Sequence, residues 1–367
     1  MKKYDFNNVV VLHDKDRIPL SSVERKKRQG PYRYYGAQGV IDHIDDYLFD
    51  GEYILIAEDG ENLKSQKQNI AQLVCGKFWV NNHAHIVTTT DICRLRYFYY
   101  LINSINLSKY ITGSAQPKLS QSSMRKMSFV LPKIDIQDKI LKIVGGIDDK
   151  IQLNTEINKN LSEQLQALYT SEFDVTAHHE TAKLSDICHY SIEKVNVDEL
   201  STKTYYSTEN MQPNKVSSVE ATNLPSIKQT TRCHKGDVLV SNIRPYFKKI
   251  EYVTTECGCS TDVLCFVPAS KELSAFLYET LYADRFFDYM VAGSKGTKMP
   301  RGDKQQIMQY EVVMPSSEQL LAFNAAATPI LALITNGMLE NERLSMLRDS
   351  LLSRLMSGEL DVSDIDF

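Results

Sequence analysis

Two stretches of the chain, 183 positions apart, repeat one order of apolar and polar positions. At 129–140 the sequence reads FVLPKIDIQDKI, and at 312–323 it reads VVMPSSEQLLAF. In both, a short apolar run ends at a proline, a few polar residues follow, and a long segment with helical periodicity begins. Proline cannot donate a backbone hydrogen bond, and it is tolerated where a helix begins. Each stretch is therefore predicted to be a strand, a stop and a helix start.

The segments after the two prolines share a spacing that alternates between four and three. The apolar or small positions of the first segment are Ile140, Val144, Ile147, Ile151, Asn154, Asn158, Leu161, Leu165 and Leu168. Adding 183 gives Phe323, Ala327, Ile330, Ile334, Gly337, Asn341, Leu344, Arg348 and Leu351. This spacing is typical of a coiled-coil seam, so the two helices are predicted to pair as an antiparallel coiled coil. The pairing contacts are expected from Ile147, Ile151, Asn158, Leu161, Ile330, Ile334, Asn341 and Leu344.

One position of the seam is asparagine in both copies. A polar residue at a seam costs stability and fixes the register of a helix pair, so Asn158 and Asn341 are predicted to face or neighbour each other. The simpler alternative is that each helix packs only on its own domain.

The repeat extends upstream of the helices. GSAQPKL at 113–119 and GSKGTKM at 293–299 predict that Lys118 and Lys298 are equivalent. GEYILIAEDG, which begins at Gly51, and GDVLVSNIRP, which begins at Gly236, each combine a turn glycine with a strand-like apolar run. The runs that end at Val87 and Val267 are predicted as further equivalent strands.

These repeats predict an α+β protein in which two mixed α/β domains stand in tandem and each is followed by a long helix. The predicted segments are a first domain at 1–131, a helical spacer at 132–173, a second domain at 174–314, a second spacer at 315–358, and an acidic tail at 359–367. A helix of about 35 residues would span roughly 50 Å.

Composition and charge narrow the class of protein. The chain of 367 residues is 43% hydrophobic and 24% charged, as in folded globular proteins. Its net charge is −4, but residues 1–131 carry 18 Lys and Arg against 13 Asp and Glu, so a basic part stands within an acidic whole. Seven cysteines without CxxC spacing favour reduced thiols over disulfides or a metal site. Without an uninterrupted apolar run of 18 residues or an export signal, the expected location is the cytoplasm.

Two similar domains joined by paired helices suit a ligand with two separated sites, and double-stranded DNA is such a ligand. Basic and polar side chains interleaved with aromatic ones are expected to contact phosphates and base edges. These candidates are Lys26, Lys27, Arg28, Arg33, Tyr34, Tyr35, Lys118, Asn242, Arg244, Tyr246, Lys248, Lys249, Lys295, Lys298, Arg301 and Lys304. The alternative for any one of them is a solvated charged surface.

The order of these motifs resembles the specificity (S) subunit of type I restriction-modification systems. The resemblance rests on the repeated strand, proline and asparagine-bearing seam, on the blocks GEYILIAEDG, WVNNHAHIV, GSAQPKL and GDVLVSNIRP, and on the ending LRDSLLSRLMSGELDV. It covers essentially the whole chain. The second helix departs from the pattern at Gly337 and Arg348.

The resemblance implies that each domain is a target-recognition domain that reads one half of a bipartite DNA sequence. It implies that the helices set the gap between the halves and help to dock two methyltransferase (M) subunits, which use S-adenosylmethionine to methylate adenine N6. In complexes that also cleave DNA, two restriction (R) subunits would use ATP and Mg²⁺. No cofactor is expected in this chain, which would be a non-catalytic recognition subunit.

Catalytic motifs are sparse in the sequence. It has no GxxxxGK[ST] phosphate loop and no Asn or Asp followed by Pro-Pro and an aromatic residue. His83 and His85 alternate in NNHAH, but without a carboxylate or cysteine at useful spacing they indicate a structural or DNA-contacting role rather than a metal site. Two alternatives stay open. One is a metal-dependent nuclease that uses Asp59 with Glu58 and Lys64, and the other is a purely structural coiled-coil scaffold.

Overall fold

The computed structural model describes residues 1–66, 68–113, 116–173 and 181–365, which fold into two compact units. Unit 1 comprises Met1–Gln152 and Glu342–Phe367, and unit 2 comprises Leu153–Asn341. Both long predicted helices therefore contribute one half to each unit. Ser114 and Ala115, the first residues of the segment predicted at 174–314, and the last two of the acidic tail lie outside the described residues.

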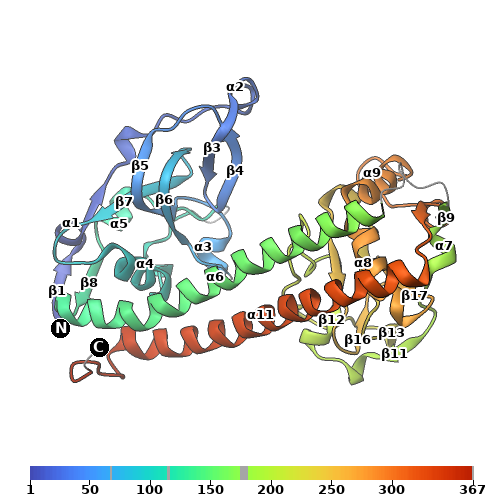
Figure 1. The fold of residues 1–367 in the computed structure, drawn as a ribbon. Coiled ribbons are helices and arrows are strands. Elements are labelled where there is room, and N and C mark those ends of the chain that lie inside the picture. The colour runs from blue at the N-terminus through green and yellow to red at the C-terminus, as the bar shows by residue number, and fades with distance from the viewer. Residues whose placement is uncertain (67, 114–115, 174–180, 366–367) are drawn as a thin grey trace. The chain divides into compact units, whose positions relative to one another are not determined.

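Unit 1 is built on a six-stranded sheet in the order β2-β7-β5-β6-β3-β4 (Figure 1). Its strands are β2 (Val10–Leu12), β3 (Gln29–Gly36), β4 (Gly39–Ile44), β5 (Phe49–Ala57), β6 (Ala71–Val80) and β7 (Ala84–Thr89). A separate antiparallel pair joins β1 (Lys2–Asp5) to β8 (Ser128–Leu131). The predicted strand before the first proline is thus β8. Gly51 lies inside β5 opposite Gly76, so its prediction as a turn glycine was wrong.

The helices of unit 1 cover its sheet and close its core. They are α1 (Phe6–Val9), α2 (Ser22–Lys27), α3 (Asn62–Ser65), α4 (Leu95–Ser104), α5 (Gln121–Met124) and the first part of α6 (Ile134–Glu172). Helix α4 buries an apolar face that includes Tyr97, Phe98 and Leu101. The Phe98 ring meets that of Phe129 from β8 edge-on at 5.2 Å, so the strand that leads into α6 is held in the same core.

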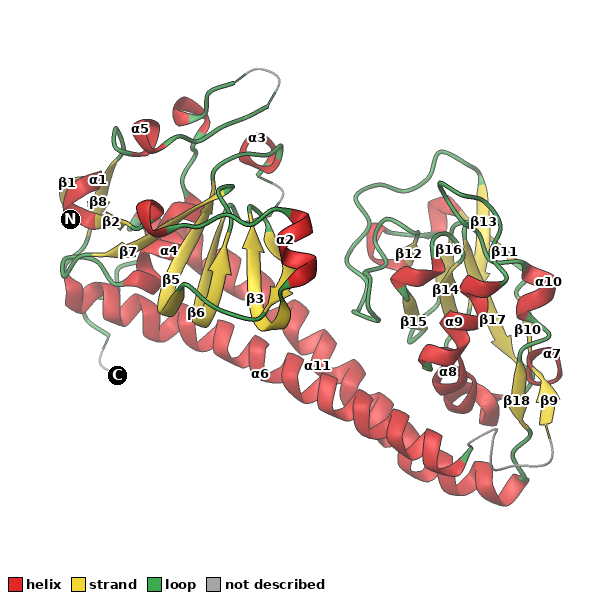
Figure 2. Ribbon diagram, turned by 90° about the horizontal axis from the view of Figure 1, so that it is seen from above, coloured by secondary structure: helices red, strands yellow, loops and turns green. Residues whose placement is uncertain are grey.

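Unit 2 contains two four-stranded sheets and a strand pair (Figure 2). One sheet has the order β10-β17-β14-β15, with bounds Cys188–Tyr190, Val263–Pro268, Val238–Ser241 and Ile250–Tyr252. The other has the order β11-β13-β16-β12, with bounds Lys194–Asn196, Gln229–Cys233, Cys257–Cys259 and Tyr205–Tyr206. The pair is β9 (Thr181–Lys183) with β18 (Glu311–Val313). The helices are α7 (Leu184–Ile187), α8 (Ser274–Tyr282), α9 (Asp284–Ala292), α10 (Lys304–Ile307) and part of α11 (Ser317–Ser357).

The two units repeat one topology. In unit 1, β1 pairs with β8, and the chain order β2-β7-β5-β6 forms one side of the sheet. In unit 2, β9 pairs with β18, and β10-β17-β14-β15 follows the same order. A long helix follows β8 and another follows β18. The predicted tandem repeat of mixed α/β domains, each followed by a long helix, is therefore confirmed.

The two long helices run antiparallel and pack side by side in each unit (Figures 1 and 2). In unit 2 the seam contains an asparagine contact, but Asn341 is bonded by Asn154 at 3.0 Å rather than by Asn158. Asn158 instead donates to the Ile334 carbonyl at 3.2 Å and lies beside Gly337. Since 154 and 337 are equivalent, as are 158 and 341, these two contacts are repeat-related. The small Gly337 leaves room for the Asn158 side chain.

In unit 1, Arg348, which also departs from the apolar seam pattern, has a partner on the other helix. Its guanidinium forms an ion pair with Asp148 of α6 at 3.0 Å. The repeat-equivalent positions in unit 2 are Leu331 and Leu165, both buried in the apolar core. A charge pair in one unit thus replaces an apolar pair in the other. The predicted pairing of the two helices is confirmed. The two residues that depart from the pattern, Gly337 and Arg348, lie beside Asn158 and Asp148 of the other helix.

Helix α11 is long and apolar enough to cross a membrane by length and composition, and it is the one such helix among the described residues. Residues 319–339 carry no charged side chain, although no uninterrupted apolar run of 18 residues exists. In this structure Phe323, Ala327 and Leu331 of α11 are buried in the core of unit 2. They meet Tyr169 and Phe173 of α6 in that core.

The core of unit 2 also encloses a carboxyl group, Glu279 of α8, which is 1% exposed. Burial raises its pKa to about 8, and nearby Lys215 opposes that shift. One carboxyl oxygen, Oε2, has no hydrogen-bond partner among the described residues. The group therefore holds its proton at neutral pH, where the unfolded chain would release it.

Glu279→Gln is expected to stabilise unit 2 by about 1–3 kcal/mol at pH 8 and by much less at pH 5. Between the ordinary pKa of a glutamate and about 8, folding binds a proton, so wild-type stability falls as pH rises through this window. Urea unfolding followed by far-UV circular dichroism at the two pH values measures this difference. An equal gain at both pH values would contradict the burial of an ionisable group as its cause.

Candidate nucleic-acid interface

The basic cluster of unit 1 lies on and after the short helix α2. Ser21 caps this helix through a reciprocal capping box with Glu24, which holds the helix in place beside β3 and β4. Lys26 and Lys27 are exposed on it. Arg28, at the C-cap, forms an ion pair with Asp45 at 2.9 Å and lies over the Trp79 ring at 5.0 Å. The two lysines are thus presented to solvent, and the arginine anchors the end of the helix to the domain.

Two candidates from this region do not reach the surface. Tyr34 is 0% exposed and its hydroxyl bonds to the backbone of Leu20. Tyr35 is 5% exposed and its ring meets that of Phe78 edge-on. Their prediction as DNA-contacting residues was wrong, because the two side chains lie on opposite faces of β3 and each is buried in an apolar cluster there. Arg33 stays on the outside and donates to the Tyr35 hydroxyl at 3.2 Å.

A buried polar network joins β7 of the unit 1 sheet to the segment that follows β2. His85 Nδ1 is 2.5 Å from the carboxylate of Asp14, and His85 Nε2 donates to the Leu119 carbonyl at 2.7 Å. Asp14 also accepts hydrogen bonds from the Ile86 N–H and from Gln121. Burial opposes its ionisation, but the hydrogen bonds from His85 and Ile86 and the nearby charges outweigh that effect and lower its pKa. His85 is therefore structural: it ties the 119–121 segment to the sheet.

The hairpin that precedes this segment carries Lys118. Thr112 and Lys118 exchange two backbone hydrogen bonds, and the Pro117 carbonyl accepts from the Gly60 N–H at 3.2 Å. The Lys118 ammonium lies 3.2 Å from a Glu58 oxygen, and the neighbouring His83 bonds to Asp59 at 2.7 Å. The hairpin is therefore fixed to the turn that leaves β5.

Unit 2 contains the same hairpin, three residues further along than the sequence repeat placed it. Lys295 and Arg301 exchange two backbone hydrogen bonds, and the Pro300 carbonyl accepts from the Arg244 N–H at 2.7 Å. The equivalent of Lys118 is thus Arg301, at an offset of 183. The prediction that Lys298 is the equivalent of Lys118 was wrong. The shared sequence is G-[ST]-x-x-P-[KR], in which Gly113 and Gly296 both have positive φ. Backbone pairing, rather than the GSxxxK similarity, reveals this register.

The turn that leaves β14 brings together the next group of candidates. Asn242 is buried, whereas Tyr246 is 49% exposed. Lys248 forms an ion pair with Asp284 at 2.9 Å, and Lys249 donates to the Thr208 carbonyl at 2.6 Å. Burial lowers the pKa of Lys249. Both lysines thus hold this turn to the unit, which leaves Arg244 and Tyr246 as its available side chains.

Around the second hairpin the basic side chains differ in their partners. Lys295 forms an ion pair with Asp303 at 2.6 Å, and Arg301 forms one with Asp262 at 3.0 Å. Lys298 and Lys304 are exposed. All four belong to unit 2, and Arg301 is bridged through its backbone to Ile243 in the turn that leaves β14.

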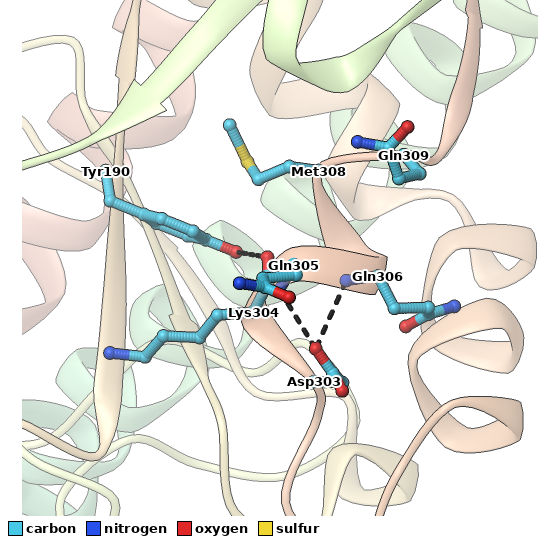
Figure 3. Close-up of a pocket in the computed structure, with 7 residues that line it drawn as sticks. All are labelled: Tyr190, Asp303, Lys304, Gln305, Gln306, Met308 and Gln309. Atoms are coloured by element: carbon cyan, nitrogen blue, oxygen red, sulfur yellow. Dashed lines mark hydrogen bonds between the residues drawn. The ribbon is translucent and has the colours of Figure 1, made fainter.

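A hollow of about 780 Å³ adjoins Lys304 at the start of α10 (Figure 3). Its lining consists of Tyr190, Asp303, Lys304, Gln305, Gln306, Met308 and Gln309. Asp303 caps α10 by accepting from the backbone of Gln305 and Gln306, and the Tyr190 hydroxyl donates to the Lys304 carbonyl. Gln305 and Gln309 are exposed amides of the kind that bond base edges, and sequence reasoning missed them. One glutamine in the short helix α10 and one just after it carry no distinctive pattern.

The carboxylates of the nuclease alternative already have ion-pair or hydrogen-bond partners. Glu58 pairs with Arg17 at 3.2 Å as well as with Lys118, and Asp59 pairs with His83. In the described part of the chain, no group of three or more His, Cys, Asp or Glu side chains is arranged to hold a metal ion. The cluster is a set of ion pairs that brace the turn.

Comparison with known proteins shows what the chain is similar to. Residues 2–163 match the type I restriction modification DNA specificity domain. A putative type I restriction enzyme specificity subunit of Haemophilus influenzae is 31% identical over 131 residues, which are 36% of this chain and 33% of that protein. The HindI specificity subunit of the same organism is 21% identical over an alignment that covers 98% of this chain and 96% of that protein.

A solved structure supports the fold. The S subunit of a type I restriction-modification system from M. genitalium aligns with a TM-score of 0.57 and 15% identity, over 96% of this chain and 95% of that chain. The first two curated relatives are matched over about a third of their own length. Residues 2–163 are thus similar to a type I restriction modification DNA specificity domain, and the chain along its length is similar to type I restriction enzyme specificity subunits. The predicted resemblance is confirmed.

Proposed function

We propose that the chain is the DNA sequence-specificity subunit of a type I restriction-modification complex, in which each unit reads one half of a bipartite DNA target. The observation that carries this proposal is the repeated framework of sheet, turn and G-[ST]-x-x-P-[KR] hairpin, in which basic side chains accompany the turn in both units. Equivalent frameworks with different side chains suit two different half-sites. The family match of residues 2–163 supports the same reading.

The remaining parts of the proposal concern the helices and the partners. The paired helices set the number of unread base pairs between the half-sites, and the helices with their adjoining surfaces dock two M subunits. Those partners supply S-adenosylmethionine and methylate adenine, and R subunits, where present, supply ATP- and Mg²⁺-dependent cleavage. The chain itself is non-catalytic and acts on DNA in the cytoplasm.

Long-read sequencing of DNA from cells that express this chain with its methyltransferase tests the proposal. N6-methyladenine is scored by sequence motif and compared with cells that lack the chain. A split motif with a fixed gap that depends on the chain is expected. If both proteins are produced and associate but no new motif appears, the proposal fails, and metal-dependent cleavage by the purified chain becomes the test of the nuclease alternative.

Replacing Lys26 and Lys27 by alanine is expected to weaken DNA binding about tenfold at 0.15 M salt without changing the methylated motif. Exposed lysines neutralise phosphates, so the slope of log affinity against log salt should fall by about 2. Fluorescence anisotropy with a duplex that carries the motif measures both quantities. Lys109→Ala with Lys126→Ala removes equal charge elsewhere in unit 1 and is the control. A double variant that keeps the wild-type slope would place Lys26 and Lys27 outside the interface.

A further inference from the structure

The turns that leave β5 and β14 are equivalent, but they place different residues at one backbone position. Gly60 donates its N–H to the Pro117 carbonyl, and Arg244 donates its N–H to the Pro300 carbonyl. Both residues have positive φ, +119° for Gly60 and +50° for Arg244. Glycine adopts such a conformation at little cost, whereas the Cβ of an arginine is crowded there. The position that bonds to the hairpin thus has positive φ in both units, and it is glycine in unit 1 and arginine in unit 2.

The side chain of Arg244 lacks the partners that its neighbours have. Lys248 and Arg301 each form an ion pair within the unit. Arg244 forms no side-chain hydrogen bond or ion pair to the described residues, and its enclosed Nε is without a partner there. Its strained backbone is therefore not compensated by an interaction of its own guanidinium. Backbone strain is concentrated at functional sites, so an arginine with a strained backbone and no side-chain partner in the described structure is expected to bind a ligand.

The surroundings of Arg244 are those of a contact site for a planar ligand with hydrogen-bonding edges. The buried Asn242, two residues away, leaves its side-chain oxygen Oδ1 without a partner in the described part of the chain. On the other side, Tyr246 and Phe247 are 49% and 37% exposed, and their rings lie 4.8 Å apart. A guanidinium fork beside exposed aromatic rings is a combination that contacts DNA, whereas the enclosed Oδ1 of Asn242 lies beside Gly302 within the unit.

We propose that Arg244 is a DNA-contacting residue of unit 2, whose guanidinium binds a pair of acceptor atoms on the duplex. The inference rests on the proposed function and names the side chain through which unit 2 acts. The acceptor pair is either the O6 and N7 edge of a guanine or two oxygens of a phosphate. Loss of the arginine relaxes the recognised sequence in the first case and weakens binding to every sequence in the second.

The experiment compares Arg244→Gly and Arg244→Lys with wild type in the complex with the methyltransferase subunits. Glycine relieves the backbone and removes the fork, so the melting temperature should stay or rise by up to about 2 °C, while DNA affinity falls at least about fivefold. Lysine keeps the charge but not the fork, so it should restore binding incompletely. Asn214→Gly, at another positive-φ position of unit 2, is the matched control and should leave binding unchanged.

Mapping of N6-methyladenine separates the two sources of the acceptor pair. If it is a guanine edge, Arg244→Gly relaxes one base in one half of the motif and leaves the other half intact. If it is a phosphate, every site weakens equally and the salt slope falls by about 1. Wild-type affinity and motif in Arg244→Gly, or a melting temperature lowered by several degrees, would overturn the inference. If wild type itself yields no split motif, the proposed function fails, and the inference fails with it.

Discussion

One heptad inserted into both long helices is expected to lengthen the gap of the recognised DNA sequence by about three base pairs. Seven helical residues add about 10 Å, and each base pair adds 3.4 Å. A whole heptad keeps the seam in register, whereas four residues would rotate it. The insertion points are after Gln152 in α6 and after Asn341 in α11, at the borders between the two units.

These two points preserve the contacts that hold each unit together. Asn154 and Asn341 remain together in unit 2, and Asp148 and Arg348 remain together in unit 1. The matched controls are a four-residue insertion at both points, which should abolish methylation, and a heptad in α6 alone, which should weaken it. The methylated motif of each variant is read by long-read sequencing. A motif with its original gap in the double-heptad variant would refute the role of the helices in setting the gap.

Asp14→Ala is expected to destabilise unit 1 by about 3–5 kcal/mol, because it leaves the buried His85 without its carboxylate and Gln121 without its acceptor. The Asp14 side chain is 3% exposed, so water cannot replace the lost interactions. The only tryptophan of the chain, Trp79, lies buried in unit 1, and its fluorescence therefore reports unfolding of that unit. Asp16→Ala, half exposed on the same turn, should change stability by less than about 0.5 kcal/mol.

The same carboxylate gives wild-type unit 1 a defined acid sensitivity. The pKa of Asp14 is lowered in the folded state, so its contribution to stability is fully present above the ordinary pKa of an aspartate and is lost as pH falls through the lowered value. Wild type and Asp14→Ala should therefore converge in stability at low pH and diverge near neutrality. Urea unfolding followed by Trp79 fluorescence at pH 3 and pH 7 measures this difference. A constant difference at both pH values would exclude the ionised Asp14 as its source.

The sequence by itself determined the tandem repeat, the two strands before the prolines and both long helices. Those features follow from local rules, since proline stops a strand and a spacing of four and three places apolar side chains on one face of a helix. The order of motifs along the chain also indicated the resemblance to type I specificity subunits, which the comparisons confirm. Charge and residue type selected Lys26, Lys27 and Arg244 as candidates. Lys26 and Lys27 are exposed, and Arg244 is partly exposed.

Only the tertiary structure decided which side chains are available and which are partners. Tyr34 and Tyr35 look like exposed aromatics beside basic residues, but apolar clusters cover both faces of β3 at these positions and bury both side chains. The equivalence of Lys118 with Arg301 depends on backbone pairing, which links residues far apart in sequence and leaves little trace in residue type. The positive φ of Arg244, its backbone bond to the distant Pro300 carbonyl and its lack of side-chain partners among the described residues are visible only in the folded chain. Periodicity is a local property of the chain, whereas burial, pairing and strain arise when distant segments meet.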